Sequence, residues 1–290
     1  MMWIRWAVLG ALCCASVAPA EDSQKTKNRK FRFQYAATVE GLPKDAAVRA
    51  WLPVPSNSDA QDVKLLEQKT PAPAKIQAEP KYGNRILSFA SQGDASGKLS
   101  FDVHYEIVRR EVTAKTGEKT LPKKEESLFL SPNELVPTEG KPLQLLKGLQ
   151  LKSDPFLAGL QLYDRVEQHM KYDKSGTGWG RGDSVWACDS RFGNCTDFHS
   201  LFISLARAQK IPAKFIIGFP LPPQRGKGSV GGYHCWAKYH VKDRGWVPVD
   251  ISEADKHPEM KEYYSKNLTE NRVAFTAGLD LNLVPRQSGP

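Results

Sequence analysis

The hydrophobic pattern of the chain changes its period part-way along, and this change limits the folds that the chain can adopt. Over residues 31–112, apolar and polar residues alternate in short runs such as FRFQYAATV and KLSFDVHYEIVRREV, with turn formers between them. Alternation with a period of two is typical of strands, and several short strands with frequent turns favour a β-sandwich. From Asp154 onward, apolar residues first recur at helical spacing and strand-like runs follow. This order predicts an α+β fold in which a β-sandwich precedes a mixed region.

The domain boundaries follow from the same pattern. Residues 28–115 are predicted to form the β-sandwich domain, and residues 116–153, with several Lys, Pro and Glu, a surface connector. Residues 154–290 are predicted to form the second domain. It begins with Asp154 before Pro155, and a capping residue followed by proline is a helix-start signal.

The first twenty residues have the layout of a secretory signal peptide. Arg5 gives a basic start, an apolar run follows, and Ala18-Pro19-Ala20 is a small-x-small cleavage site. We therefore expect residues 1–20 to be removed by cleavage near Ala20 and the mature protein to be secreted or periplasmic. No segment is apolar over enough residues to predict a transmembrane span.

The charge distribution argues against a nucleic-acid partner. The 290 residues include 41 Lys and Arg against 32 Asp and Glu, a formal net charge of +9. These basic residues are scattered instead of forming a stripe with interleaved aromatic residues, which nucleic-acid binders more often show. A basic surface on an exported protein instead suits contact with an anionic envelope or cell-wall polymer.

The second region places a cysteine where a thiol can become reactive. Cys195 follows Gly193-Asn194 at the start of a helical pattern. Only the thiolate is a nucleophile, and the free N–H groups and dipole of a helix N-terminus favour that anion. A thiol nucleophile also needs a base and a group that orients the base.

His234 and Asp250 are the candidate base and orienting group, on two strand-like runs joined by the turn signal KDRG. Because side chains alternate along a strand, the register of this hairpin decides whether the two residues meet. If His240 pairs with Trp246, the two residues share a face one diagonal step apart. If the register moves by one residue, they face opposite sides. We predict the first register.

At these residues the sequence resembles the transglutaminase-like superfamily, in particular bacterial exported members with a β-rich N-terminal domain. GNCTDFHSLFISLARAQKIPAKFIIGF, GYHCWAKYHV and GWVPVDISEA are similar to three blocks of that family, and the similarity covers roughly residues 155–255. The resemblance implies a papain-like fold with a catalytic triad of Cys195, His234 and Asp250. It also implies acyl transfer from a peptide or protein amide through a thioester, with no cofactor.

Other polar and aromatic residues are candidates for supporting roles. Trp179 or Trp186 could supply an indole N–H to the oxyanion, as a tryptophan does in true transglutaminases, although packing is the commoner role for such a residue. Asn194 could orient the backbone at the site. His199, one helical turn after Cys195, is an alternative base, but a packing role beside the site is favoured.

The remaining cysteines of the mature chain allow one disulfide. If Cys235 faces away from His234 on a strand, it is free to pair with Cys188, which would leave Cys195 as the single thiol. The alternative is two small buried thiols. A zinc site that uses these three cysteines with His199 and His234 is a minor alternative, because the tight Cys-x-x-Cys spacing of structural zinc is missing. We therefore predict no metal.

These features favour an exported thiol hydrolase or acyltransferase. A protease or amidase is favoured over a crosslinking transglutaminase, because water is always present and nothing in the sequence specifies an acceptor amine. Cell-wall peptide amides are one candidate substrate. A non-catalytic scaffold that binds an envelope polymer is the alternative, although a scaffold would not need a triad.

Overall fold

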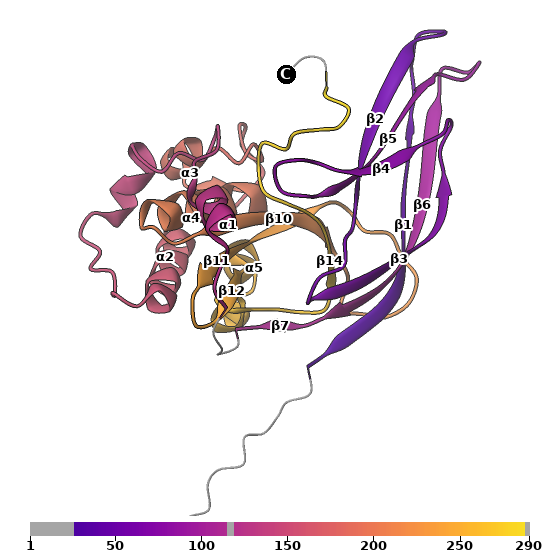
Figure 1. Ribbon diagram of the computed structural model, residues 1–290. Coiled ribbons are helices and arrows are strands. Elements are labelled where there is room, and N and C mark those ends of the chain that lie inside the picture. Colours follow the sequence, from indigo (N-terminus) through magenta and orange to yellow (C-terminus); the bar gives the residue numbers. More distant parts are fainter. Residues whose placement is uncertain (1–25, 115–118, 288–290) are drawn as a thin grey trace, which may run out of the picture.

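The computed structural model describes residues 26–114 and 119–287 (Figure 1). The signal peptide predicted over residues 1–20 lies outside these described residues. In Figure 1 a compact part with helices on the left adjoins long strands on the right, and β10 and β14 run between them. Within the described residues, every helix is too short or too polar to cross a bilayer.

The N-terminal strands form two antiparallel three-stranded sheets. The first sheet has the order β1 (Asn28–Val39), β6 (Leu99–Arg110), β3 (Gln61–Lys69). The second has the order β2 (Ala47–Val54), β5 (Arg85–Gln92), β4 (Lys75–Ala78). Every second residue of β6 is buried, and one apolar cluster draws side chains from both sheets, including Phe33, Leu87 and Ile107. Shared burial between two sheets defines a sandwich, so the predicted β-rich N-terminal architecture is confirmed.

The second region is built on a four-stranded sheet of order β12-β11-β10-β14. Its strands are β10 (Ala213–Pro220), β11 (His234–Val241), β12 (Gly245–Val249) and β14 (Arg272–Ala277). The buried helix α4 (Cys195–Ala208) packs against β10 and β11. Around it lie α2 (Pro155–His169), α3 (Ser184–Ser190), α5 (Ile251–Lys256), η2 (Pro258–Met260) and α6 (Lys261–Tyr264). Two short strand pairs, β8 (Lys171–Tyr172) with β9 (Phe192–Gly193) and β7 (Val112–Thr113) with β13 (Asn267–Leu268), complete the α+β fold.

The helix-start signal at Asp154 acts as expected. Its carboxylate accepts a hydrogen bond from Leu157 N at 2.9 Å, and Pro155 occupies the first turn, where no backbone donor is needed.

The segment predicted as a surface connector is instead packed into the second region. It contains α1 (Lys123–Leu130) and η1 (Lys141–Leu146), and both Phe129 and Val136 are buried. The buried Arg207 of α4 donates hydrogen bonds to Ser131 O at 2.8 Å and to Asn133 Oδ1 at 2.6 Å. The few apolar residues of this segment are too widely spaced to show a period, so the sequence pattern underestimated its burial.

Strand β14 belongs to both regions. It pairs with β10, yet its residues Val273 and Phe275 lie in the apolar cluster of the sandwich. The side-chain amide of Gln61 on β3 bonds to the backbone of Ala274 at 2.8 and 2.9 Å. Where β10 and β14 shift register, a Cβ on Gly218 would lie 1.8 Å from Val273 O, so only glycine permits this approach. The close fit determines where β14 lies on the sheet.

Candidate active site

Cys195 is the first residue of α4, and a capping box fixes the start of that helix. The side chain of Asn194 accepts from Thr196 N at 2.8 Å, and the Asp197 carboxylate accepts from Asn194 N at 3.0 Å. Asn194 also donates to the hydroxyl of Tyr233 at 2.9 Å. Asn194, which the sequence suggested as a backbone-orienting residue, thus holds the turn that presents the thiol.

The glycine-rich loop before the cysteine is held by the same carboxylate. Asp197 accepts from Gly180 N at 2.7 Å and from Gly182 N at 3.2 Å. A Cβ on Gly193 would lie 2.4 Å from the Asp197 carboxylate, so the chain can pass this close only as glycine. Burial raises the pKa of Asp197 above its usual value. The loop and the helix start therefore form one hydrogen-bonded unit around Cys195.

The hairpin that carries the candidate base adopts the predicted register. His240 pairs with Trp246 and Ala237 pairs with Val249, so Asp250 follows the last paired residue. His234 Nε2 lies 2.8 Å from Asp250 Oδ2, and both side chains are buried. This bond leaves Nδ1 of His234 for the Cys195 thiol, its other side-chain partner. The structure thus brings Cys195, His234 and Asp250 together in the order of a triad.

Asp250 is held by more groups than the sequence indicated. Arg272 Nη1 lies 2.8 Å from Asp250 Oδ2, the oxygen that His234 also contacts. The other oxygen caps α5 by accepting from Glu253 N at 3.2 Å. Burial alone would raise the pKa of Asp250, but the positive charges of His234 and Arg272 hold it well below its usual value. Asp250 is therefore an anion at neutral pH.

This anion controls the protonation of the other two groups. Burial alone would lower the pKa of His234, but the charge and hydrogen bond of Asp250, followed by Cys195, raise it to about 9. The pKa of Cys195 lies well below its usual value, chiefly because the Cys235 thiol hydrogen-bonds to it and then because of His234. Both shifts favour a thiolate beside an imidazolium.

Arg272 and Cys235 are the residues of this site that sequence reasoning missed. Arg272 opens β14, 22 residues after Asp250, and no local motif marks it. Cys235 was considered only as a disulfide partner, although its position next to His234 could have suggested contact with the thiol.

The predicted Cys188–Cys235 disulfide is wrong, because Cys188, Cys195 and Cys235 are all free thiols. Cys188 lies on α3, where its sulfur is 3.8 Å from Lys141 O. The prediction assumed strand alternation between His234 and Cys235, but His234 is the first residue of β11. Both residues pair with β10, yet both side chains are hydrogen-bond partners of Cys195. The alternative of small buried thiols is what the structure shows.

His199 supports the site without facing the thiol. Its Nε2 accepts from Ile251 N at 3.0 Å, so Nδ1 carries the proton and donates to Cys195 O at 2.6 Å. Burial lowers the pKa of His199. A neutral imidazole with both nitrogens engaged ties α4 to the start of α5 and is not available as a base.

The two candidate tryptophans lie elsewhere. The indole of Trp179 donates to Gly176 O at 2.9 Å within its own loop. Trp186 lies on α3 with its ring against Phe192, 5.3 Å between centroids. Among the described residues, neither indole has a hydrogen bond to Cys195. Among the same residues, no cluster of His, Cys, Asp and Glu side chains is suited to a metal ion.

Comparison with known proteins finds a family model that matches part of the chain. Residues 144–251 match the family described as the transglutaminase-like superfamily. An uncharacterized protein of Haemophilus influenzae is 26% identical over 97% of this chain and 88% of its own length.

Among solved structures, a proposed cysteine protease from Cytophaga hutchinsonii is 17% identical, with 88% of this chain and 84% of that chain covered and a TM-score of 0.58. The periplasmic domain of TgpA from Pseudomonas aeruginosa is also 17% identical, with 84% and 77% covered and a TM-score of 0.43. The family model thus matches residues 144–251, and the first of these structural similarities shows a shared fold.

Proposed function

We propose that this protein is an exported thiol-dependent acyl-transfer enzyme that cleaves amide or peptide bonds through a Cys195 thioester. The observation that carries the proposal is the arrangement of Cys195, His234 and Asp250, in which the thiol has a lowered pKa and the imidazole a raised one. A thiolate–imidazolium pair supplies both a nucleophile and an acid before substrate arrives.

The steps follow from the positions of the three groups. The Cys195 thiolate attacks the carbonyl carbon, and the electron pair of the C=O bond moves to oxygen. When the tetrahedral intermediate collapses, the C–N bond breaks and the His234 imidazolium gives its proton to the leaving amine. Neutral His234 then takes a proton from water, whose oxygen attacks the thioester, and the thiolate leaves as the acid product forms.

The backbone N–H of Cys195 is the best candidate for stabilising the oxyanion. It occupies the first position of α4, where a backbone donor has no acceptor within its own helix. The indole of Trp179 already has a backbone partner, which leaves it less suited to this role.

Asp250, Arg272 and His199 act on the reaction as positioning residues. Asp250 keeps His234 charged and oriented, and Arg272 keeps Asp250 ionised. His199 joins the backbone of Cys195 to that of Ile251, next to Asp250. Removing any one of them changes the geometry of the pair that reacts without removing a reacting atom.

Export and the role of the sandwich are parts of the same proposal. The N-terminal pattern of residues 1–20 supports a secreted or periplasmic location after cleavage near Ala20. We assign the sandwich, residues 28–115, to contact with an envelope or cell-wall polymer and residues 154–290 to catalysis. The net positive charge suits an anionic polymer.

Thiol labelling and peptide cleavage test the proposal together. Wild type should react with iodoacetamide near pH 6, where an ordinary thiol of pKa about 8.5 is almost unreactive. It should also cleave members of a fluorogenic peptide-amide library, and Cys195→Ala should lose both activities. Cys188→Ala is the matched control, because it removes a buried thiol outside the site.

Two results would count against an enzyme. Labelling of Cys195 that follows an ordinary thiol titration would remove the support for a thiolate, and cleavage that survives in Cys195→Ala would assign it to a contaminant. Adding a primary amine to the cleavage assay distinguishes hydrolysis of the thioester from transfer of its acyl group to the amine. The amine should lower the yield of free acid only slightly if hydrolysis is the main reaction, as we propose.

A further inference from the structure

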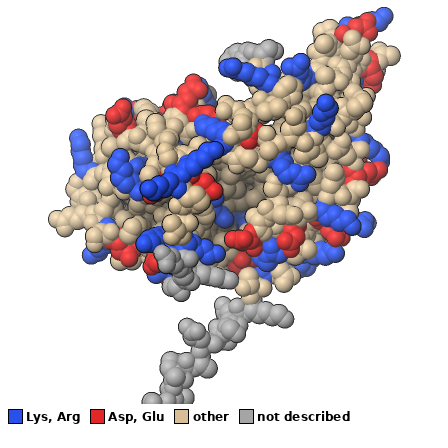
Figure 2. Space-filling view, viewed as in Figure 1, with Lys and Arg blue, Asp and Glu red and all other residues tan. Residues whose placement is uncertain are grey.

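A second site lies in a hollow on the sheet of the second region, where that sheet meets the sandwich. Figure 2 shows this face hollowed between the two parts of the molecule, with basic side chains around the hollow. A cavity of about 250 Å³ lies here. It is lined from β10 and β11, from β14, and from two loops of the sandwich around Asn57 and Tyr82.

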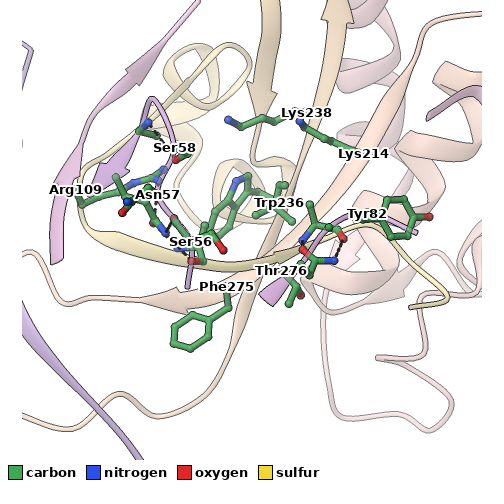
Figure 3. Close-up of a pocket in the computed structure, with 17 residues that line it drawn as sticks. Ser56, Asn57, Ser58, Tyr82, Arg109, Lys214, Trp236, Lys238, Phe275 and Thr276 are labelled. Atoms are coloured by element: carbon green, nitrogen blue, oxygen red, sulfur yellow. Dashed lines mark hydrogen bonds between the residues drawn. The ribbon is translucent and has the colours of Figure 1, made fainter. Parts of the chain in front are cut away.

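Three basic side chains line this cavity (Figure 3). Lys214 comes from β10, Lys238 from β11 and Arg109 from the end of β6. Within the described part of the chain none of the three forms an ion pair. Lys214 Nζ instead lies 3.8 Å from the ring centroid of Trp246, and Arg109 Nη1 reaches Gln61 Oε1 only at 3.4 Å.

Two further donors at the cavity have no acceptor in the described structure. Arg109 Nε and the indole Nε1 of Trp236 are both buried without a hydrogen-bond partner. The side chains are 2% and 1% exposed, so bulk water does not satisfy them either. Buried donors are almost always paired in native proteins, because leaving one unpaired costs about 1–3 kcal/mol.

The walls of the cavity are rigid. The Asn84 side chain donates to Ala277 O and accepts from Ala277 N, both at 2.7 Å, which ties one sandwich loop to β14. The Gln61 side chain bonds to Ala274 in the same way on the other side. These bonds hold the walls of the cavity together before any ligand arrives, and this lowers the entropic cost of binding.

We propose that this cavity is a binding site for a small oxyanion of the phosphate or sulfate type. Such an ion carries two negative charges and accepts hydrogen bonds through every oxygen. It would meet the guanidinium of Arg109, the ammonium groups of Lys214 and Lys238, and the indole N–H of Trp236. Figure 3 shows these groups around one space. The site is separate from the thiol and does not depend on the proposed acyl transfer.

The protonation of the lysines supports an anion as the missing partner. Burial first, and then the charges of Lys214 and Arg109, lowers the pKa of Lys238 to about 7, and the exposed Asp59 opposes this only weakly. Burial lowers the pKa of Lys214 to about 8, against the weak opposing charges of Glu125 and Asp59, and that of Arg109 to about 9. A bound dianion would reverse these shifts, so binding should draw protons onto the lysines.

Sulfate is the best probe, because its charge does not change between pH 6.5 and 8.5. With the mature protein, isothermal titration at constant ionic strength should show one saturable sulfate site. Its affinity should be on the order of tenfold higher at pH 6.5 than at pH 8.5, because Lys238 is protonated only at the lower pH. Inorganic phosphate should compete with sulfate.

Matched variants connect the binding to the cavity. Lys238→Met and Arg109→Met should each abolish the sulfate-dependent rise in Tm, while Lys44→Met, in an exposed turn, should keep it. Without anion, the two cavity variants should melt higher than wild type, because each removes a cation that has no ion-pair partner among the described residues. This rise also shows that they fold. Stabilisation by sulfate that equals that of sodium chloride, or that persists unchanged in Lys238→Met, would overturn the proposal.

A vesicle experiment identifies the source of the anion. We propose a free ion as the ligand. The Lys238→Met variant should therefore bind vesicles that contain phosphatidic acid as tightly as wild type does, relative to neutral vesicles. Binding to these vesicles through Lys238, together with no response to free phosphate or sulfate, would overturn the proposal of a soluble ligand.

Discussion

Two groups of charged side chains lie close together on one sheet, and they differ in their balance. Around Asp250, the cations His234 and Arg272 surround an anion at 2.8 Å each, and the Cys195 thiolate adds a second negative charge. Around Lys238, the cations Lys214 and Arg109 outweigh the exposed Asp59, and within the described residues no carboxylate forms an ion pair with these cations.

This difference in charge balance indicates what each group is suited to do. A balanced group is satisfied within the protein and can hold a reactive pair in a fixed geometry. An unbalanced group costs stability until a ligand supplies the missing charge. Trp236 contacts both groups. Its ring lies 6.1 Å from that of His234 and 4.9 Å from the Arg272 guanidinium, and it also lines the cavity that contains Lys238.

Removing the negative charge of Asp250 from the balanced group should have the largest effect on both activity and stability. Asp250→Asn keeps the shape but leaves His234 and Arg272 without a negative partner. The pKa of His234 should fall, and the pair should revert to a neutral thiol and imidazole. We expect a loss of about 10³–10⁴ in kcat/KM for peptide cleavage and a loss of about 3–5 kcal/mol in the free energy of unfolding.

Denaturant unfolding and iodoacetamide labelling measure the two parts of this prediction separately. A folded Asp250→Asn protein that still labels at the wild-type rate near pH 6 would show that Asp250 does not control the thiol.

Removing one cation from the balanced group should have the next largest effect. Arg272→Met leaves Asp250 with His234 alone, and we expect a loss of about 3 kcal/mol in the free energy of unfolding. Because a positive charge near His234 is lost, its pKa should rise above about 9, so the alkaline limit of activity should move to higher pH. The pH profile of kcat/KM checks this shift.

Arg272→Lys is the matched control for charge. It should retain the position of the alkaline limit, although the ammonium cannot repeat the planar contact with Asp250 and Trp236. If Arg272→Met changes stability but not the pH profile, Arg272 has only a structural role.

The hydrogen bond from Cys235 offers a finer test of the same group. Cys235→Ala removes a donor to the Cys195 thiolate, and a bond to a charged group is worth about 1.5–3 kcal/mol. The pKa of Cys195 should therefore rise by about one to two units, which moves the acid limit of iodoacetamide labelling upward. Cys235→Ser keeps a donor and should change the limit less. Identical profiles for all three proteins would contradict this role.

Changing the unbalanced group around Lys238 should have the smallest effect. Its contribution to the pH dependence of the free energy of unfolding has the opposite sign to that of the balanced group. Unfolded Lys238 keeps its proton up to a pKa of about 10.4, whereas the folded residue loses it near pH 7. The unfolded state therefore binds more protons between pH 7 and 10, so Lys238 makes the free energy of unfolding rise with pH. His234, with its raised pKa, acts in the opposite direction between pH 6.5 and 9.

Lys238→Met isolates this contribution by comparison with wild type. In the absence of anion the variant should be more stable than wild type at pH 6.5, and the gap should narrow as the pH rises to 9. Urea unfolding at several pH values measures the gap. A gap that is constant with pH would show that folded Lys238 keeps an ordinary pKa.

The features that were predictable from sequence are those that have a local signal. Periodicity revealed the β-rich region, and the hairpin register followed from the requirement that His234 and Asp250 meet. The start of α4 could be read from Asn194 and the residues after it. In each case the residues that form the feature are neighbours in sequence or share one short turn.

The features that were missed depend on contacts between distant segments. Arg272 reaches Asp250 only because β14 pairs with β10, and no pattern near residue 272 records that pairing. The cavity at Lys238 needs three elements that are far apart in the chain. Cys235 was misassigned because strand alternation alone did not reveal that its side chain, like that of His234, contacts Cys195.

The position of β14 gives the sandwich an influence on chemistry that takes place outside it. Phe275 packs against Phe33 with ring centroids 5.7 Å apart, and Arg272 lies three residues earlier on the same strand. A slip of β14 by one residue would turn its side chains to the opposite faces and withdraw the guanidinium from Asp250. Substitutions in the sandwich core can therefore act as inactivating lesions, and a screen for loss of function should find them there as well as around the thiol.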